Sequence, residues 1–177
     1  PYYDEILSLK DAGITIDVVE DGETFEDNAR KKAEEVLAVA HADAVLSDDS
    51  GLMVDALGGA PGVYSARYAG EGHDDAANNA KLLEAMQSVP DGARACRFVS
   101  AIALARRGRQ TLIRLGEVEG TLLRAPRGTD GFGYDPLFYY EPAGRTFAEL
   151  SACEKNLVSH RKRGLEAVRA ALEAERA

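Results

Sequence analysis

Alternating and helical runs of apolar residues divide the chain into candidate strands and helices. Residues 13–20, GITIDVVE, alternate apolar and polar side chains as a half-buried strand does. Residues 24–42 repeat apolar positions at helical spacing, and Thr24 followed by Asp27 predicts a capped helix start. Residues 44–51, AVLSDDSG, predict a short buried strand that runs into a turn.

The second half of the chain continues this mixture. Residues 74–89 predict a helix, and residues 96–106 and 111–124 predict two longer strands joined as a hairpin. A final helix is expected to bury Leu165, Val168 and Leu172. The pattern predicts an α/β fold, with a mixed, twisted sheet flanked by helices, in one domain over 1–177.

Composition and charge exclude several classes of protein. The chain has 21 Lys and Arg against 30 Asp and Glu, a formal net charge of -9, which disfavours binding to nucleic acid. No stretch approaches the roughly 20 apolar residues of a membrane helix, so no membrane partner is expected. Cys96 and Cys153 are far apart and lack zinc-site spacing, which favours a reducing, cytoplasmic location.

Two acidic residues carry the first candidate chemistry. Asp48 and Asp49 end an apolar run and precede Ser50. Adjacent strand residues face opposite sides of a sheet, so the two carboxylates would not grip one ion together. One of them with an acid from elsewhere would suffice for Mg²⁺, which completes its shell with water and phosphate oxygens. A plain polar turn is the alternative.

Phosphate binding through the commonest loops is excluded. The chain contains neither GxxxxGK[ST] nor GxGxxG, because Pro136 stands where the third glycine of the latter belongs. The segment EKNLVSHRKR, residues 154–163, is instead rich in basic residues. As one helix it would place Lys155, Ser159 and Lys162 on one face. It is either a phosphate-binding surface or a solvated basic patch.

Four segments, in this order, resemble the inosine triphosphate pyrophosphatase family: TFEDNARKKA (24–33), SDDSGLMVDALGGAPGVYSARYAG (47–70), GFGYDPLF (131–138) and TFAELSACEKNLVSHR (146–161). The resemblance covers nearly the whole chain. It implies two lobes around a central cleft, dependence on Mg²⁺ and a homodimer. It also implies hydrolysis of non-standard purine nucleoside triphosphates to the monophosphate and pyrophosphate.

The resemblance also assigns site residues. Asp49 corresponds to the catalytic carboxylate and a metal ligand, and Glu20, with Asp21 as the alternative, corresponds to the second metal ligand. The expected substrate contacts are Ser50, Phe132, Gly133, Tyr134, Asp135, Lys155, Ser159, His160 and Arg161. Phe132 would stack on the base, and donors from His160 and Arg161 would select a 6-keto purine. Core packing is the alternative for Phe132 and Tyr134.

One family segment has no counterpart in these 177 residues. The family begins with a strand and a [ST]-x-N-x-x-K loop that holds the triphosphate. We expect either that this segment precedes Pro1 or that the protein lacks it.

The sequence therefore predicts a pyrophosphatase for inosine, deoxyinosine and xanthosine triphosphates (ITP, dITP and XTP). The alternatives are a pyrophosphatase of similar fold for pyrimidine or modified nucleotides, and a catalytically silent nucleotide-binding or dimer-scaffold protein.

Overall fold

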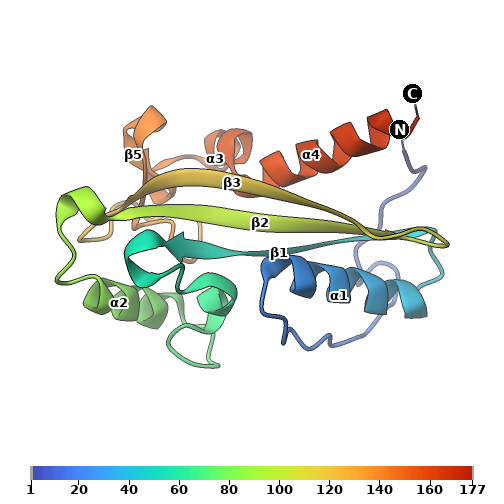
Figure 1. Ribbon diagram of the computed structural model, residues 1–177, viewed down its shortest axis with the longest axis horizontal. Helices are drawn as coiled ribbons and strands as arrows, with labels where there is room; N and C mark the ends of the chain where they lie inside the picture. The colour runs from blue at the N-terminus through green and yellow to red at the C-terminus, as the bar shows by residue number, and fades with distance from the viewer. Residues whose placement is uncertain (1, 177) are drawn as a thin grey trace.

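One curled sheet organises the protein. The computed structural model describes residues 2–176 and shows five strands in the order β1-β2-β3-β4-β5 (Figure 1). They are β1 (Ala44–Val54), β2 (Ala95–Arg106), β3 (Leu112–Leu122), β4 (Phe138–Tyr140) and β5 (Arg145–Thr146). In place of the expected mixed sheet, every described pair is antiparallel, because strands that follow one another in the chain pair in order.

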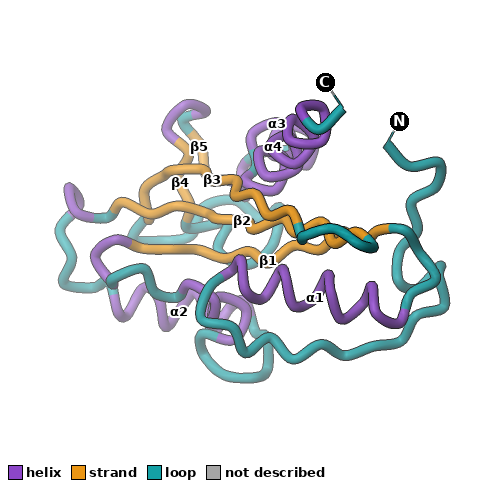
Figure 2. Tube along the Cα trace, turned by 45° about the vertical axis from the view of Figure 1, so that its right-hand side comes forward, coloured by secondary structure: helices purple, strands orange, loops and turns teal. Residues whose placement is uncertain are grey.

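Helices cover both faces of this sheet, which confirms the α/β class. They are α1 (Phe25–Val39), α2 (Asp75–Ala85), α3 (Ala152–Val158) and α4 (His160–Ala174). Figure 2 shows α1 on one side of the sheet, and α3 and α4 on the other. Short 3₁₀ helices span Asp55–Leu57, Gly62–Arg67, Asp91–Ala93, Glu141–Ala143 and Phe147–Glu149. No helix in the described part of the chain is long and apolar enough to cross a membrane.

Strand β2 is largely apolar from Phe98 to Ala105 because both of its faces are covered there. Its odd-numbered residues from Val99 to Ala105 pack against α1, whereas Ile102 and Leu104 pack with Val168 of α4. Because side chains alternate between the two faces of a strand, β2 packs against α1 on one face and against α4 on the other. The cluster under α1 comprises Phe25, Ala29, Ala33, Val99, Ala101, Ala103 and Ala105.

A third cluster lies toward the other end of the sheet. Phe98 contacts Phe138 and Phe147, with ring centroids 4.6 and 5.8 Å away. Leu52 and Val54 of β1 join this cluster, as do Leu82 and Met86 from the chain around α2. The fold therefore has two lobes, one around α1 and α4 and one around the aromatic cluster, and the middle of β1 runs between them (Figure 1).

Helix α4 meets β3 through two glycines. A Cβ atom on Gly116 would lie 2.1 Å from the carbonyl oxygen of His160 and 2.2 Å from the backbone nitrogen of Gly164. Because Gly164 faces the sheet, the buried side of α4 runs through His160, Gly164 and Val168. The prediction for Leu165 was therefore wrong, and this side chain is 44% exposed.

Two other predictions of secondary structure were also wrong. Residues 13–20 are half-buried at every second position, as expected, but they form no strand, because no described strand pairs with them. The expected single helix over 154–163 is two helices. Ser159 has an extended backbone, with ψ at 152°, and its side chain accepts a hydrogen bond from the Lys162 backbone N–H, so Ser159 ends α3 and caps α4.

Candidate active site

Asp48 and Asp49 point to opposite faces of the sheet, as the alternation of a strand requires. Asp49 pairs in register with Ala101, on the face that α1 covers. Asp48 pairs with Ile102, whose side chain packs with α4. The two carboxylates therefore belong to two different groups of side chains, one on each face.

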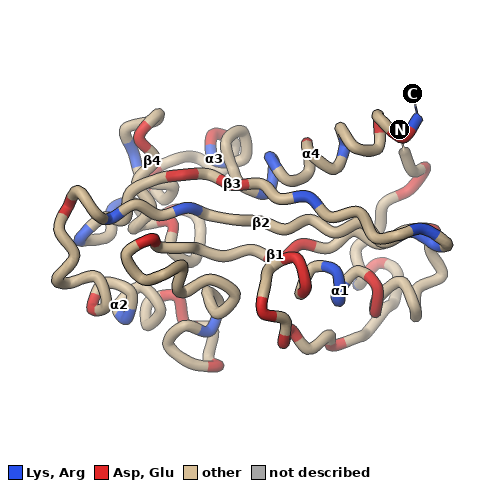
Figure 3. Tube along the Cα trace, viewed as in Figure 1, with Lys and Arg blue, Asp and Glu red and all other residues tan. Residues whose placement is uncertain are grey.

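The α1 face holds Asp49 among three polar side chains. The Asn28 amide Nδ2 donates to Asp49 Oδ2 at 3.1 Å. The Lys32 ammonium lies 3.5 Å from Asp49 Oδ1 and 3.3 Å from Glu20 Oε1. Asn28 and Lys32 are one helical turn apart, so α1 presents both to the same carboxylate. Figure 3 shows acidic and basic positions close together where α1 passes β1.

The Asp49 carboxyl has a raised pKa. Its side chain is only 12% exposed, and burial disfavours the charged form. The charge of Lys32 and the hydrogen bond from Asn28 lower the pKa, but Glu20 raises it again. The net direction is upward, so Asp49 is a stronger proton acceptor than an ordinary aspartate.

The structure separates the two alternatives for the second acid. Glu20 shares the Lys32 ammonium with Asp49, and its carbonyl oxygen accepts a hydrogen bond from Arg67 at 3.2 Å. Asp21 instead pairs with Lys31 at 2.6 Å, away from Asp49. Glu20 is therefore the acid that lies beside Asp49.

Ser50 lies on the other face, with Asp48 rather than Asp49. Its Oγ is 3.0 Å from Asp48 Oδ2 and 2.9 Å from Ser100 Oγ, and Arg161 Nε donates to the same Asp48 oxygen at 2.8 Å. Burial raises the pKa of Asp48, but the pair with Arg161, the Ser50 hydroxyl and the charge of Lys32 together lower it, and the net direction is below its usual range. A chain of polar groups thus connects the buried Ser100 to the Arg161 guanidinium.

Two positively charged side chains lie over the ring of Phe132. Lys155 Nζ lies 4.3 Å from the ring centroid and Arg161 Cζ lies 5.6 Å from it. The ring is 61% exposed, so core packing does not explain it. An exposed aromatic face beside two positive groups is suited to a planar, anionic ligand.

The rest of the GFGYDP segment supports this ring from below. Asp135 is 1% exposed, accepts from the Phe132 backbone N–H at 2.9 Å and forms an ion pair with Lys155. The Tyr134 hydroxyl donates to the carbonyl oxygen of Ser65 at 2.7 Å, so Tyr134 follows the core-packing alternative. The Gly133 N–H donates to Asp75 at 2.7 Å.

At the start of α4, after the capping residue Ser159, His160 packs into the aromatic cluster. The His160 ring is buried and stacks on Phe98, with centroids 5.0 Å apart. Burial, with the neighbouring charges of Arg161 and Lys155, lowers its pKa to about 3, so the ring is neutral at physiological pH. Its Nδ1 is buried without a hydrogen-bond partner among the described residues.

Three polar residues of the site were not identified from the sequence: Asn28, Lys32 and Ser100. Asn28 and Lys32 lie within TFEDNARKKA, and their spacing of four on a predicted helix was a usable signal. Ser100 is the one polar residue in the run 98–105 of a predicted strand, which was a second usable signal. What could not be read from the sequence is that the fold brings all three to Asp48, Asp49 and Ser50.

The donors around Asp49 suit a hard divalent cation. Within residues 2–176 no three Asp, Glu, His or Cys side chains are close enough to enclose a metal. Two carboxylates, those of Asp49 and Glu20, nevertheless converge on one cationic group, the Lys32 ammonium. Mg²⁺ commonly takes one or two carboxylates and leaves its other positions to water and phosphate.

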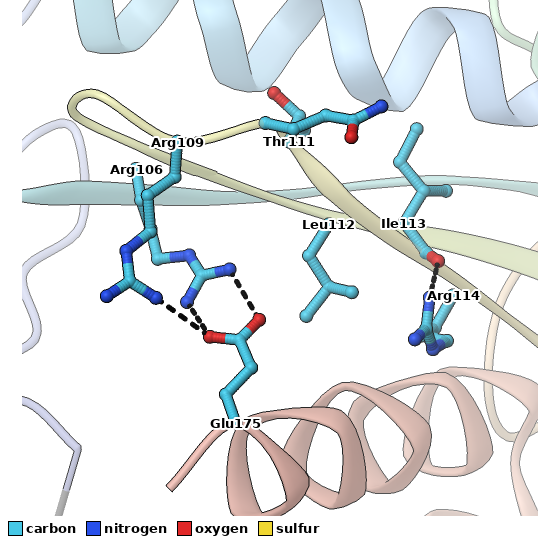
Figure 4. A pocket seen from close by; sticks show the side chains of 8 residues that line it. Arg106, Arg109, Thr111, Leu112, Ile113, Arg114 and Glu175 are labelled. Atoms are coloured by element: carbon cyan, nitrogen blue, oxygen red, sulfur yellow. Dashed lines mark hydrogen bonds and ion pairs between the residues drawn. The ribbon is translucent and has the colours of Figure 1, made fainter.

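A cavity of about 440 Å³ lies at the hairpin between β2 and β3, away from Asp49. Figure 4 shows Arg106 and Arg109 beside Glu175. Arg106 donates twice to the Glu175 carboxylate, at 2.5 and 2.9 Å, and Arg109 donates at 3.0 Å. These ion pairs connect the β2–β3 hairpin to Glu175, just after α4. We therefore assign the arginines a structural role.

Comparisons with known proteins agree with this arrangement. Residues 2–171 match the Ham1 family. A protein of Syntrophobacter fumaroxidans, named dITP/XTP pyrophosphatase, is 56% identical over 161 residues, which are 91% of this chain and 68% of that protein. A Leuconostoc mesenteroides protein of the same name is 50% identical over 161 residues, 91% of this chain and 80% of that protein.

Solved structures show the same fold. The Ham1 protein of Staphylococcus aureus superposes with a TM-score of 0.84 at 42% identity, covering 90% of this chain and 82% of that one. A Mycobacterium abscessus structure, described as a nucleoside-triphosphatase and dITP/XTP pyrophosphatase, gives 0.78 at 46% identity, covering 93% and 83%. These matches confirm the resemblance seen in the sequence: the chain belongs to the Ham1 family.

Proposed function

We propose that this protein hydrolyses ITP, dITP and XTP to the nucleoside monophosphate and pyrophosphate, and so removes deaminated purines from the nucleotide pool. The observation that carries the proposal is the convergence of Asp49 and Glu20 on the Lys32 ammonium. Membership of the Ham1 family and the names of its relatives support the substrate class.

We further propose that Asp49 and Glu20 would hold Mg²⁺, which would supply positive charge for the phosphates and for activation of water. Asp49 orients the attacking water and accepts its proton. The water oxygen bonds to phosphorus, and the bond between the α and β phosphates breaks to release pyrophosphate. Burial of Asp49 favours this role because it raises the pKa of the carboxyl. Lys32 offers a further positive charge to the phosphates.

The purine would contact the group of side chains that contains Asp48, Arg161 and Phe132. Stacking on the exposed Phe132 ring is worth about 1–3 kcal/mol. Asp48 takes the Nε–H of Arg161, which leaves the terminal nitrogens of the guanidinium for the 6-keto oxygen. An adenine amino group would meet these donors with its own donor, and a site built on such hydrogen bonds can reject the wrong base by about 10⁴-fold. His160, being buried, acts mainly by placing Arg161.

The Asp48 group and the Asp49 group lie on the two faces of the sheet at the edge formed by β1. In the described sheet β1 is an outer strand, and consecutive residues Asp48 and Asp49 belong to the two groups. A nucleotide that lies across this edge would present its base to one face and its phosphates to the other.

Paired variants of the two aspartates test the assignment. In the full-length protein with Mg²⁺, Asp49→Asn should keep less than about a tenth of the turnover on dITP, since it removes the proton acceptor and a metal ligand. Asp48→Asn, the matched control, should keep most of the turnover at saturating dITP, because its effect through Arg161 falls on KM. Equal losses in the two variants, or a fully active Asp49→Asn, would contradict the assignment.

We also propose a homodimer in the cytoplasm, as the family resemblance implies. Light scattering on the purified protein tests the first point, since a monomeric mass across micromolar concentrations would contradict it.

A further inference from the structure

Asn28 is buried between two parts of the candidate active site. It belongs to the first turns of α1 and is 1% exposed. Its Oδ1 accepts a hydrogen bond from the Gly22 backbone N–H at 2.7 Å, and its Nδ2 donates to Asp49 Oδ2 at 3.1 Å. The orientation of the amide is determined, because a backbone N–H requires the oxygen and a carboxylate requires the NH₂ group.

The contact with Gly22 is close. A Cβ atom on Gly22 would lie 2.6 Å from Asn28 Oδ1 and 2.9 Å from Asp27 Cβ. Any larger residue would therefore push the segment away from α1. This segment carries Glu20, two residues earlier, and Glu20 shares Lys32 with Asp49. One side chain thus connects the Asp49 carboxylate to the backbone that holds the second acid.

We propose that Asn28 is a positioning residue that sets the Asp49 carboxylate and the Glu20 segment at the separation which hydrolysis needs. The inference rests on the proposed function and assigns to it a residue that contacts neither the water nor the phosphates. Hydrogen-bonding partners behind metal-binding carboxylates commonly change activity or metal affinity by about 10–100-fold.

The chain offers a matched control in Asn78. This residue is also buried, and it too lies four residues after a helix N-cap, Asp74 in place of Thr24. Its Oδ1 accepts from the Ala69 N–H at 2.6 Å, and its Nδ2 donates to the Ala66 carbonyl at 3.0 Å. Asn78 therefore makes the same two kinds of bond, but to backbone alone and not to a carboxylate.

The test compares Asn28→Asp with Asn78→Asp in the full-length protein. Each change keeps the shape of the side chain and the acceptor for a backbone N–H, replaces the donor by an acceptor and adds a carboxyl group, which faces the Asp49 carboxylate at Asn28 and the Ala66 carbonyl at Asn78. We expect Asn28→Asp to lower kcat for dITP about 10–100-fold, with KM changed by less than about threefold. Asn78→Asp should lower the melting temperature about as much as Asn28→Asp does, but its kcat should stay within about threefold of wild type.

A second variant gives a readout that does not depend on turnover. Asn28→Ala removes both bonds, and calorimetry should show Mg²⁺ binding about tenfold weaker than in wild type. Unchanged kcat in Asn28→Asp, or equal losses of kcat in the two Asp variants, would overturn the inference while wild type stays active. A wild-type protein that hydrolyses none of the three triphosphates would instead overturn the proposed function.

Discussion

The contact between the glycines of β3 and α4 allows a quantitative prediction. In Gly116→Ala the new methyl group would lie 2.1 Å from the His160 carbonyl oxygen and 2.2 Å from the Gly164 backbone nitrogen. Both are backbone atoms, so no side chain can rotate away. The start of α4 must instead retreat by roughly 1 Å, because packed interiors hold few spare voids.

The cost follows from overpacking. Extra methyl groups in a filled core destabilise by about 1–3 kcal/mol, which for a domain of this size lowers the melting temperature by roughly 2–12 °C. The displaced turn carries His160 and Arg161, so KM for dITP should rise while the Asp49 group on the other face is disturbed less. Urea denaturation and steady-state kinetics measure the two effects.

Gly92→Ala is the matched control. A Cβ atom at Gly92 meets nothing within 4 Å, so its unfolding free energy should change by less than about 0.5 kcal/mol. A Gly116→Ala protein as stable as Gly92→Ala would refute the argument that α4 depends on this close approach.

Three further substitutions test individual contacts. Asp48→Asn weakens the half-exposed pair with Arg161 and should raise KM for dITP about two- to fivefold, since such pairs are worth below about 1 kcal/mol; an unchanged KM would contradict this role. Lys155→Met leaves the buried Asp135 carboxylate without its cation and should cost about 3–5 kcal/mol of unfolding free energy, part of which a second change, Asp135→Asn, restores. The pKa of His160 is about 3 when folded, against 6.5 when exposed, so the unfolded chain binds the extra proton between these values and stability falls as the pH drops through them. In urea titrations His160→Phe should lose less stability over this window, and an unaltered pH dependence would disprove that explanation.

Local patterns predicted those elements whose cause is local. The Thr24 cap and the spacing of apolar residues along α1 are properties of neighbouring residues, and the structure confirms both. The hairpin between β2 and β3 was predicted for the same reason. Ser159 could not be assigned in this way, because a serine can either continue a helix or cap a new one. In the structure Ser159 caps α4.

Contacts made between distant segments could not be predicted in this way. Leu165 fits a helical stripe, but the approach of Gly116 to Gly164 rotates the buried side of α4 away from it. Residues 13–20 alternate correctly, yet a strand also needs a partner, which the pattern of one segment cannot reveal. Strand alternation predicted that Asp48 and Asp49 face opposite sides of the sheet, whereas the side chains that surround each carboxylate could be identified only from the fold.

The most direct test of the account is pyrophosphate release by the full-length protein from ITP, with ATP and GTP as competing candidates, in Mg²⁺ and again in EDTA. We expect rapid release from ITP and little from ATP, and loss of the release from ITP when EDTA removes the metal that Asp49 and Glu20 are proposed to hold. Equal rates on ATP, or release from ITP that EDTA leaves unchanged, would contradict it.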